Sequence, residues 1–367
     1  IADAQIKDGD RLMVDILNSF PSTVVEQSRA ITRQRFVLLD LADPLILTLY
    51  HLSLLKTAQE ISEGRQAHHI PENGEGKTTK CLKVVTNPMD PTKLVEGDPR
   101  LATLPGTYLN IKKALNKPKC SASHLAEIVS LDTSLAAKLL RLVNSPYFGL
   151  IQPVDTLDRA IVVAGIDHLS ELVLGLSVVT MFQSIPIGIL CMREFWQHSV
   201  LTAHIAKLIA VRLADADEER CFAAGLLHDI GRMIMLIEHP PLSKLTVNHA
   251  TSCSLLMTMS ERDIWGFDHS LVGGLLFAKW GLPESLCQSI SGHHDLDQPM
   301  ETETLIIHTA DFLAHVMVGG QSALNLIPPV SGGMSEQLTI SANSLWTIGL
   351  QAVNLMEGTR HVFLPEN

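Results

Sequence analysis

The long apolar stretches of this 367-residue chain run well beyond the length of a β-strand, and they constrain its fold most. Leu, Ile, Ala and Val supply the hydrophobicity, whereas only 5% of the residues are aromatic. That balance favours packed helices over β-sandwiches. Short segments rich in Pro, Gly, Asn and Ser interrupt the apolar pattern at intervals typical of helices. The sequence therefore predicts an all-α protein.

Changes in composition divide the chain into an N-terminal region and a larger helical module. Residues 63–100 are rich in Gly, Pro and charged residues, which predicts a linker or extended loop and a domain boundary near residue 95. The N-terminal region, residues 1–95, is of unknown type. Its apolar and capping patterns predict helices at 11–18, 23–41 and 44–62.

From residue 101 onward the hydrophobic periodicity is strongly helical. Short helices joined by short turns predict a smaller subdomain at residues 101–186. A Pro- and Gly-containing seam at 185–188 separates it from a second, larger helical subdomain at 187–350, and residues 351–367 form a C-terminal tail. Helices of the second part are predicted at 194–214, 217–237, 243–261, 268–280, 283–291, 302–318 and 342–357.

The charge balance limits the partners. With 28 Lys and Arg against 39 Asp and Glu, the formal charge is 28 − 39 = −11, and no basic run reaches four residues. Affinity for a phosphate backbone comes mainly from clustered cations, so extended nucleic acid is excluded as a partner. Six scattered cysteines without a C-x-x-C pair, and no visible signal peptide, predict a cytoplasmic protein.

One charge-free stretch, residues 172–192, is long enough to cross a bilayer. Pro186 lies inside it, and proline breaks a helix interior. We therefore expect a buried helix followed by a connector, and no membrane span.

Histidine and aspartate residues lie inside apolar helical patterns at three places. His198 shares a helix face with Leu201 and Ile205, the pair His228-Asp229 follows an apolar run, and Asp311 lies within another. Buried carboxylates must be paired or bound to metal. Imidazole and carboxylate ligands suit zinc, iron, manganese or nickel. The alternative is a structural hydrogen-bond network that holds the helices together.

His269, at the start of its predicted helix, and the pair His293-His294 would extend this set. Together the candidates would suffice for one or two divalent ions: His198, His228, Asp229, His269, His293, His294 and Asp311. For the three added histidines a metal role and a structural role stay equally open. Other histidines, His249, His308 and His315 among them, are expected to be structural or solvated, although His308 lies one turn from Asp311.

The order of several segments resembles the HDOD domain, the HD-related output domain of bacterial signalling proteins. That domain belongs to the HD superfamily of metal-dependent phosphohydrolases. The likeness extends from residue 101 to about residue 350 and includes the run Gly-Leu-Leu-His-Asp-Ile-Gly at 225–231. The other matching segments are 104–105, 139–145, 147–149, 160–165, 195–199 and 280–283.

The resemblance implies an H…HD…D pattern in which His198, His228, Asp229 and Asp311 are the core metal ligands. His269, His293 and His294 match the added ligands of the binuclear HD-GYP relatives, which hydrolyse cyclic dinucleotides. The chain departs from those relatives in two places. Arg232 replaces the lysine that usually follows the His-Asp pair, and the segment after His294 lacks the Gly-Tyr-Pro signature.

The resemblance further implies a bacterial signal-transduction output module that binds a signalling partner protein or a nucleotide-type ligand. The alternative is a metal-dependent phosphohydrolase, a phosphodiesterase acting on a nucleotide or cyclic dinucleotide, with Asp229 and Arg232 as catalytic residues. In that case metal would activate a bridging water and Arg232 would stabilise developing negative charge. HDOD domains have no established activity as a group, so enzymatic function stays open. The N-terminal region is expected to serve as input or to form a homodimer.

Overall fold

The computed structural model describes residues 15–64, 89–97, 104–117, 120–183, 189–213, 216–295, 300–317, 326–330 and 334–364. Within these ranges all regular structure is helical and no strand occurs, which confirms the predicted all-α fold. Most of the predicted linker, the predicted seam at 185–188 and the start of the first predicted helix lie outside the described residues.

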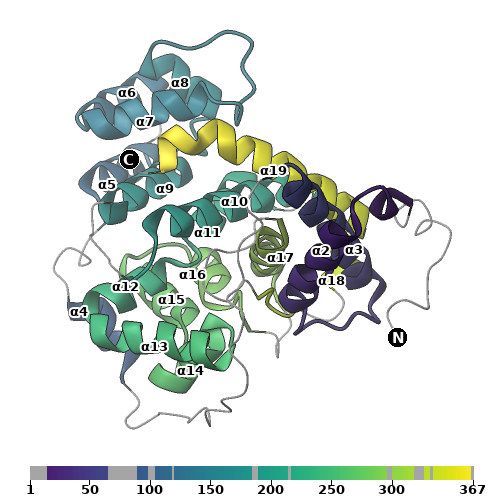
Figure 1. The fold of residues 1–367 in the computed structure, drawn as a ribbon. Helices are drawn as coiled ribbons and strands as arrows, with labels where there is room; N and C mark the ends of the chain where they lie inside the picture. The colour runs from purple at the N-terminus through teal and green to yellow at the C-terminus, as the bar shows by residue number, and fades with distance from the viewer. Residues whose placement is uncertain are drawn as a thin grey trace.

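The helices form three groups around a central pair, α10 (Met192–Ala210) and α11 (Glu218–Leu227) (Figure 1). One group is α5 (Gly106–Leu115), α6 (Ala122–Ser130), α7 (Thr133–Val143), α8 (Leu157–Ala164) and α9 (Leu169–Gln183). A second is α12 (Ile230–Glu238), α13 (Pro240–Cys253), α14 (Met257–Trp265), α15 (His269–Lys279), α16 (Glu284–Ser291) and α17 (Thr302–Met317). The third contains the N-terminal helices α2 (Ser22–Arg35) and α3 (Pro44–Ser62).

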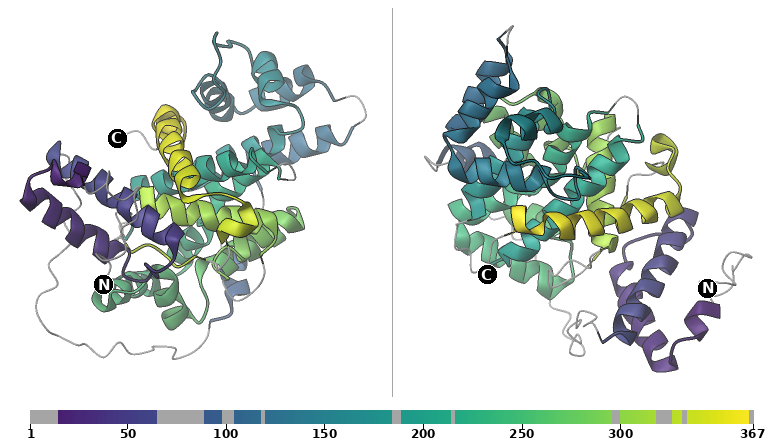
Figure 2. Two further views of the ribbon diagram at one scale, coloured as in Figure 1. Left: turned by 90° about the vertical axis from the view of Figure 1, so that its right-hand side faces the viewer. Right: turned by 90° about the horizontal axis from the view of Figure 1, so that it is seen from above.

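The N-terminal helices and the α5–α9 group lie on opposite sides of the α10–α17 body (Figure 2). The α5–α9 group joins that body mainly through α9, which packs on α11. Helix α3 contacts α17 and α19 (Ala342–Phe363), and α19 crosses from the N-terminal helices towards α7. The short helix α18 (Met334–Leu338) contacts α17.

Several predicted helices begin where a side chain caps them. Helix α3 covers 44–62 as predicted, and the Asp43 carboxylate accepts the N–H of Leu45 at 2.7 Å. The Asp132 carboxylate accepts the N–H of Leu135 at 3.0 Å and so starts α7. Both satisfy N–H groups that have no partner within the helix.

Other boundaries differ from the prediction. Residues 217–237 form two helices, α11 and α12, and residues 243–261 are divided between α13 and α14 by Ser254, which has a left-handed backbone with φ of 52°. The predicted linker contains α4 (Pro91–Gly97), which packs on α12 and α15. Helix α2 ends at Arg35, short of residue 41, and α19 continues through most of the predicted tail to Phe363.

The described part of the charge-free stretch is the buried helix that was predicted, because most side chains from Leu172 to Phe182 are buried. No single helix of the described ranges has both the length and the apolar character needed to cross a membrane. The pair α8 and α9 passes that test only when the two are joined, and it is bent by 112°.

Candidate metal centre

His228 and Asp229 separate helix α11 from helix α12. A glycine near this junction in each helix allows the helix to pack closely against a neighbouring helix. A Cβ on Gly225 would lie 2.9 Å from the Cα of Ala203 on α10, and a Cβ on Gly231 would lie 2.0 Å from the backbone oxygen of His269 on α15. Because only glycine fits at these contacts, α11 and α12 bring the His228-Asp229 pair against α10 and α15.

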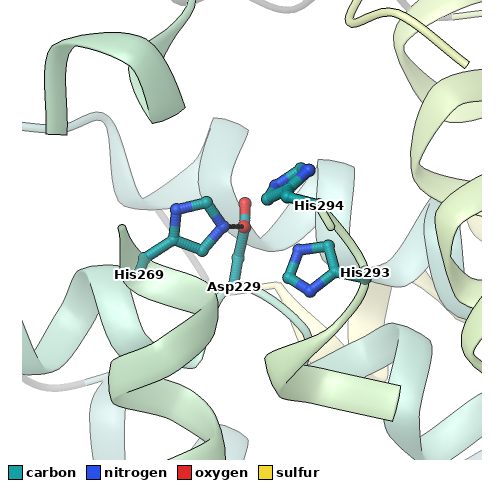
Figure 3. A group of neighbouring side chains, drawn as sticks. All are labelled: Asp229, His269, His293 and His294. Atoms are coloured by element: carbon teal, nitrogen blue, oxygen red, sulfur yellow. Dashed lines mark ion pairs between the residues drawn. The ribbon is translucent and has the colours of Figure 1, made fainter. Parts of the chain in front are cut away.

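One group of candidate ligands consists of Asp229, His269, His293 and His294, whose side chains point towards one another (Figure 3). Each offers one ligand atom, and these atoms all lie within 4.8 Å of one another. The closest pair is His269 Nε2 and Asp229 Oδ1, 2.8 Å apart. His269 begins α15, whereas His293 and His294 follow the end of α16.

A second group consists of His198, His228 and Asp229, so Asp229 belongs to both groups. Asp311 on α17 adjoins it: its Oδ1 lies 2.9 Å from His198 Nε2 and 3.6 Å from His228 Nε2. The structure therefore brings all seven predicted side chains into one cluster. We call it the metal cluster: His198, His228, Asp229, His269, His293, His294 and Asp311.

Hydrogen bonds on the outer ring nitrogens orient three of the imidazoles. Nδ1 of His228 donates to Gly225 O at 2.8 Å, and Nδ1 of His293 donates to Ile290 O at 2.6 Å. Nδ1 of His269 donates to Glu261 Oε2 at 2.6 Å. With the proton on Nδ1, the lone pair of Nε2 faces the cluster, as in metal-binding histidines.

The inner atoms of the cluster are paired only in part among the described residues. His269 Nε2 and Asp229 Oδ1 pair with each other at 2.8 Å. The Nε2 atoms of His228, His293 and His294 are buried without hydrogen-bond partners. Such groups are rare in folded proteins because burying an unpaired polar atom is costly. A purely structural network would leave these atoms unpaired, whereas a divalent ion would give all of them a partner. These residues therefore fit a divalent metal.

The electrostatics favour the charge forms that metals bind. Burial raises the pKa of Asp229, but Arg232 and then His228 and His269 outweigh it and hold that pKa well below its usual range. Burial is also the main reason that the pKa of His293 falls to about 3. An ionised carboxylate and neutral imidazoles are the forms that ligate metal.

His228 and His269 differ, because carboxylates lie beside them. Burial lowers the pKa of His228, yet Asp229 and Asp311 raise it above its usual value. Burial and then Arg232 lower the pKa of His269, yet Glu261 and Asp229 raise it to about 9. A metal bound at Nε2 of either imidazole would have to displace a proton.

Arg232, predicted as a catalytic residue, is held by two carboxylates. Its Nη1 donates to Asp229 Oδ2 at 2.6 Å and its Nε donates to Glu261 Oε1 at 3.2 Å. The sequence analysis did not identify Glu261, whose contacts with Arg232 and His269 depend on how α14 packs. The catalytic roles of Asp229 and Arg232 stay predictions.

His315 was expected to be structural or solvated, but it lies against the metal cluster. Its Nε2 is 3.5 Å from Asp311 Oδ1, and its ring centroid is 4.6 Å from that of His198. These three side chains offer ligand atoms within 4.8 Å of one another. The i,i+4 spacing from Asp311 was the available signal. His308 instead donates from Nδ1 to His293 O at 2.8 Å and so helps to hold that loop.

A cavity of about 430 Å³ opens over the cluster, within the size range of small-molecule sites. Its polar side is formed by His198, Asp229, Arg232, His294 and His315 together with Glu194, Gln197, Thr251 and Thr258. Its apolar side comes from α10, α13, α14 and two flanking segments: Ile189, Leu190, Phe195, Val247, Leu255, Leu256, Met257, Leu326 and Pro328. Metal bound in the cluster would therefore be accessible to a ligand.

The fold and the site define an all-α protein of the HD type, with an H…HD…D arrangement: His198 on α10, the pair His228-Asp229 between α11 and α12, and Asp311 on α17. Residues 101–296, more than half of the chain, match the model of the HDOD domain family. The chain belongs to the HDOD domain family, which confirms the resemblance seen in the sequence.

Curated relatives match over parts of their length. An uncharacterised protein of Treponema pallidum (strain Nichols) is 26% identical over 250 residues, which are 66% of this chain and 46% of that protein. Ribonuclease Y of Oleidesulfovibrio alaskensis is 26% identical over 128 residues, 35% of this chain and 19% of the enzyme. The chain thus spans less than half the length of these relatives.

Solved structures share the fold. An HDOD domain protein of unknown function from Geobacter sulfurreducens has a TM-score of 0.61 and 24% identity, covering 75% of this chain and 98% of its own. A candidate phosphohydrolase from Shewanella amazonensis has a TM-score of 0.56 and 22% identity, covering 74% and 96%. A candidate signal transduction protein from Marinobacter aquaeolei has a TM-score of 0.57 and 20% identity, covering 71% and 58%. At these identities the likeness is one of fold.

Proposed function

We propose that this chain is a signal-transduction module that binds a nucleotide-type ligand at a divalent metal centre. The observation that carries the proposal is the cavity of about 430 Å³ whose polar side includes part of the metal cluster and Arg232. A signalling role is in keeping with the HDOD family and with the name of the Marinobacter aquaeolei protein. A partner protein would then read the bound state.

The two sides of the cavity suit the two parts of such a ligand. Because the chain carries a formal charge of −11, attraction for phosphate has to come from local positive charge. The metal cluster and Arg232 would supply it, and a bound divalent ion would polarise a phosphoryl oxygen and lower the pKa of a bound water. Phe195, Leu256 and Met257 on the opposite side would pack against a base.

A second candidate function, phosphodiester hydrolysis, is favoured by the position of Asp229. Because Asp229 belongs to both ligand groups, its carboxylate could bridge two ions, as in two-metal phosphoesterases. In that function Arg232 would stabilise negative charge on the phosphoryl group. We rank binding first because the Nε and Nη1 of Arg232 are already engaged by Glu261 and Asp229.

The test begins with elemental analysis of protein purified without a chelator or a histidine tag. We expect one or two equivalents of iron, manganese, nickel or zinc. The loaded protein is then titrated with mononucleotides and cyclic dinucleotides by calorimetry, and the same mixtures are analysed for products by chromatography. Metal-dependent binding without products supports the first function, whereas product formation selects the second. A protein that takes up none of the four ions overturns both.

A further inference from the structure

The end of α17 is capped by the N-terminal region. Nη2 of Arg35 donates to His315 O at 2.7 Å and to Val316 O at 2.9 Å, and Nζ of Lys56 donates to Met317 O. The last carbonyls of an α-helix have no partner within the helix, and cations are favoured there by the helix dipole. Helices α2 and α3 therefore supply two cations to the helix that carries Asp311.

Arg35 is fixed in this position. It is 7% exposed, its Nη1 donates to Ser53 Oγ at 3.3 Å, and its backbone oxygen accepts the N–H of Ile327 at 3.0 Å. Burial is the main reason that its pKa falls to about 10, so the guanidinium stays charged at neutral pH. A buried charge is retained only with good hydrogen bonds, which the α17 carbonyls provide. The bond to Ile327 also holds a segment whose Leu326 lines the cavity.

The turn of α17 that Arg35 caps is the turn that carries His315. The His315 carbonyl faces Arg35, while its imidazole faces Asp311 and His198 at the edge of the metal cluster. Asp311 and His315 are four residues apart, so their side chains lie on one face of the helix. One residue thus connects the N-terminal helices to the centre.

We propose that His315 is a further metal ligand, which forms an ion position with His198 and Asp311, and that Arg35 is the positioning residue through which the N-terminal region controls occupancy of that position. The inference rests on the proposed metal-dependent function. A displacement of α2 and α3 would release the carbonyls of the last turn of α17 and the Ile327 segment together. Both the ion position and one wall of the cavity would then loosen.

The first test compares His315→Ala with the wild-type chain in equilibrium dialysis against Co²⁺. We expect the variant to lose one equivalent of Co²⁺, or to bind its weakest ion about tenfold less tightly, with a changed Co²⁺ absorption spectrum. The ions held by Asp229, His269, His293 and His294 should remain. The matched control is His249→Ala, which removes a histidine that is hydrogen-bonded to Ser260 on α14 and belongs to none of the three groups of candidate ligands.

The outcomes separate the two proposals. If the wild-type chain binds no Co²⁺, the proposed function itself fails. If it binds Co²⁺ and His315→Ala binds the same number of ions with the same affinity and spectrum, only the role of His315 is overturned.

The second test uses Arg35→Met, which removes the cap, and Arg35→Lys, which keeps the charge. We expect Arg35→Met to weaken the same ion about tenfold and Arg35→Lys to restore part of the loss. The control is Lys138→Met, which also removes a buried cation. Lys138 is on α7 and donates to Thr180 on α9, in the group of helices on the side of the molecule opposite to α2 and α3, so Co²⁺ binding should not change. If Arg35→Met does not fold, Lys56→Met tests the same cap with a partly exposed residue.

A structural role alone would give a different result. In that case Arg35→Met, measured well below its melting temperature, would be less stable but would keep the wild-type Co²⁺ affinity and spectrum. That result would overturn control by the N-terminal region.

Discussion

Helices α10 and α11 contribute to two buried polar clusters whose groups are satisfied differently. At one end, each oxygen of Glu219 accepts one hydrogen bond at 2.5 Å, from Tyr147 Oη and from Lys207 Nζ. The Lys207 ammonium also lies 4.0 Å from the centroid of the Tyr147 ring. At the other end, His228 Nε2 is buried without a hydrogen-bond partner among the described residues.

The comparison separates a structural use of buried charge from a ligand-binding use. We call Tyr147, Lys207 and Glu219 the Glu219 network; its carboxylate is satisfied within the chain, so breaking it should reduce stability. The metal cluster is satisfied only in part. Asp229 pairs with Arg232 and Asp311 with His198, but the Nε2 atoms of His228, His293 and His294 have no hydrogen-bond partner among the described residues, so a bound ion should add stability there. Loss of stability and loss of metal should therefore map to opposite ends of the same two helices.

Glu219→Gln should give the largest change. It removes the charge that balances Lys207, whose side chain is 17% exposed, and a buried ion pair that loses one partner typically costs about 3–5 kcal/mol. We expect the free energy of unfolding in urea to fall by that amount, while the number of bound Co²⁺ ions at low urea stays the same. Metal loss in the folded variant would contradict the separation of the two clusters.

The control is the double variant Glu219→Leu with Lys207→Met, which replaces both charges with apolar groups of similar length. Replacing a whole buried pair is often close to neutral. The double variant should therefore be more stable than Glu219→Gln. If it is less stable, the net contribution of the pair exceeds its desolvation cost.

The next largest effect concerns the metal cluster. In the variant His228→Ala with Asp229→Ala, we expect metal binding to be lost while the metal-free protein stays folded. A ligand at 100 times its Kd stabilises a protein by about 2.7 kcal/mol, so the wild-type chain should gain that much in saturating metal and the variant nothing. Thermal unfolding with and without metal measures both. Retained metal in the double variant would refute the ligand assignment. A loss of stability without metal is expected in either case, because Asp229→Ala removes a partner of the buried Arg232.

The fold and the two clusters differ in how far the sequence predicts them. Helix α3 and the start of α7 were predictable because local signals, Pro44 after Asp43 and the cap Asp132, mark them. The break at His228 and Asp229 was not, since neither residue interrupts a helical pattern. It follows from tertiary packing, in which Gly231 lies directly against the backbone of α15.

The candidate ligands were easier to find than the residues that support them. A carboxylate such as Asp311 inside an apolar stretch is costly, and that cost is visible in the sequence. Glu261 lies among polar residues, so its sequence context gives no such signal, whereas His315 lies in the same apolar run as Asp311 and only its i,i+4 spacing pointed to the site. Their contacts with Arg232, His269 and Asp311 depend on helix packing, which periodicity does not encode.

A smaller effect should appear on acidification, through His204 beside the Glu219 network. Its Nε2 lies 2.9 Å from Thr359 Oγ1, its ring packs on Tyr147 and Phe222, and burial with a smaller effect of Lys207 lowers its pKa to about 3. In the unfolded chain the His204 imidazole takes up a proton near pH 6.5, whereas in the folded chain it does so only near pH 3. Stability from this group is therefore complete above pH 6.5 and is lost as the pH falls.

At about 1.4 kcal/mol per pH unit, the wild-type chain should lose about 2 kcal/mol through His204 between pH 6.5 and pH 5. The glutamine of His204→Gln does not titrate in this range, so the free energy of unfolding of this variant should fall by about 2 kcal/mol less. Urea unfolding of both proteins across this range gives the difference, in which the titration of all other groups cancels. Parallel curves for the two proteins would show that His204 does not carry this dependence.

The smallest predicted effect separates the members of the Glu219 network from one another. Tyr147→Phe removes the hydrogen bond to Glu219 but keeps the ring over which Lys207 lies. Hydrogen bonds to charged groups contribute about 1.5–3 kcal/mol, and because Lys207 still pairs with Glu219 we expect a loss near 1.5 kcal/mol in urea unfolding. Combined with Glu219→Gln, the substitution should cost little more, since its partner charge is already gone. Full additivity of the two losses would mean that the Tyr147 hydroxyl stabilises the fold independently of the Glu219 charge, and that Glu219 is balanced by Lys207 alone.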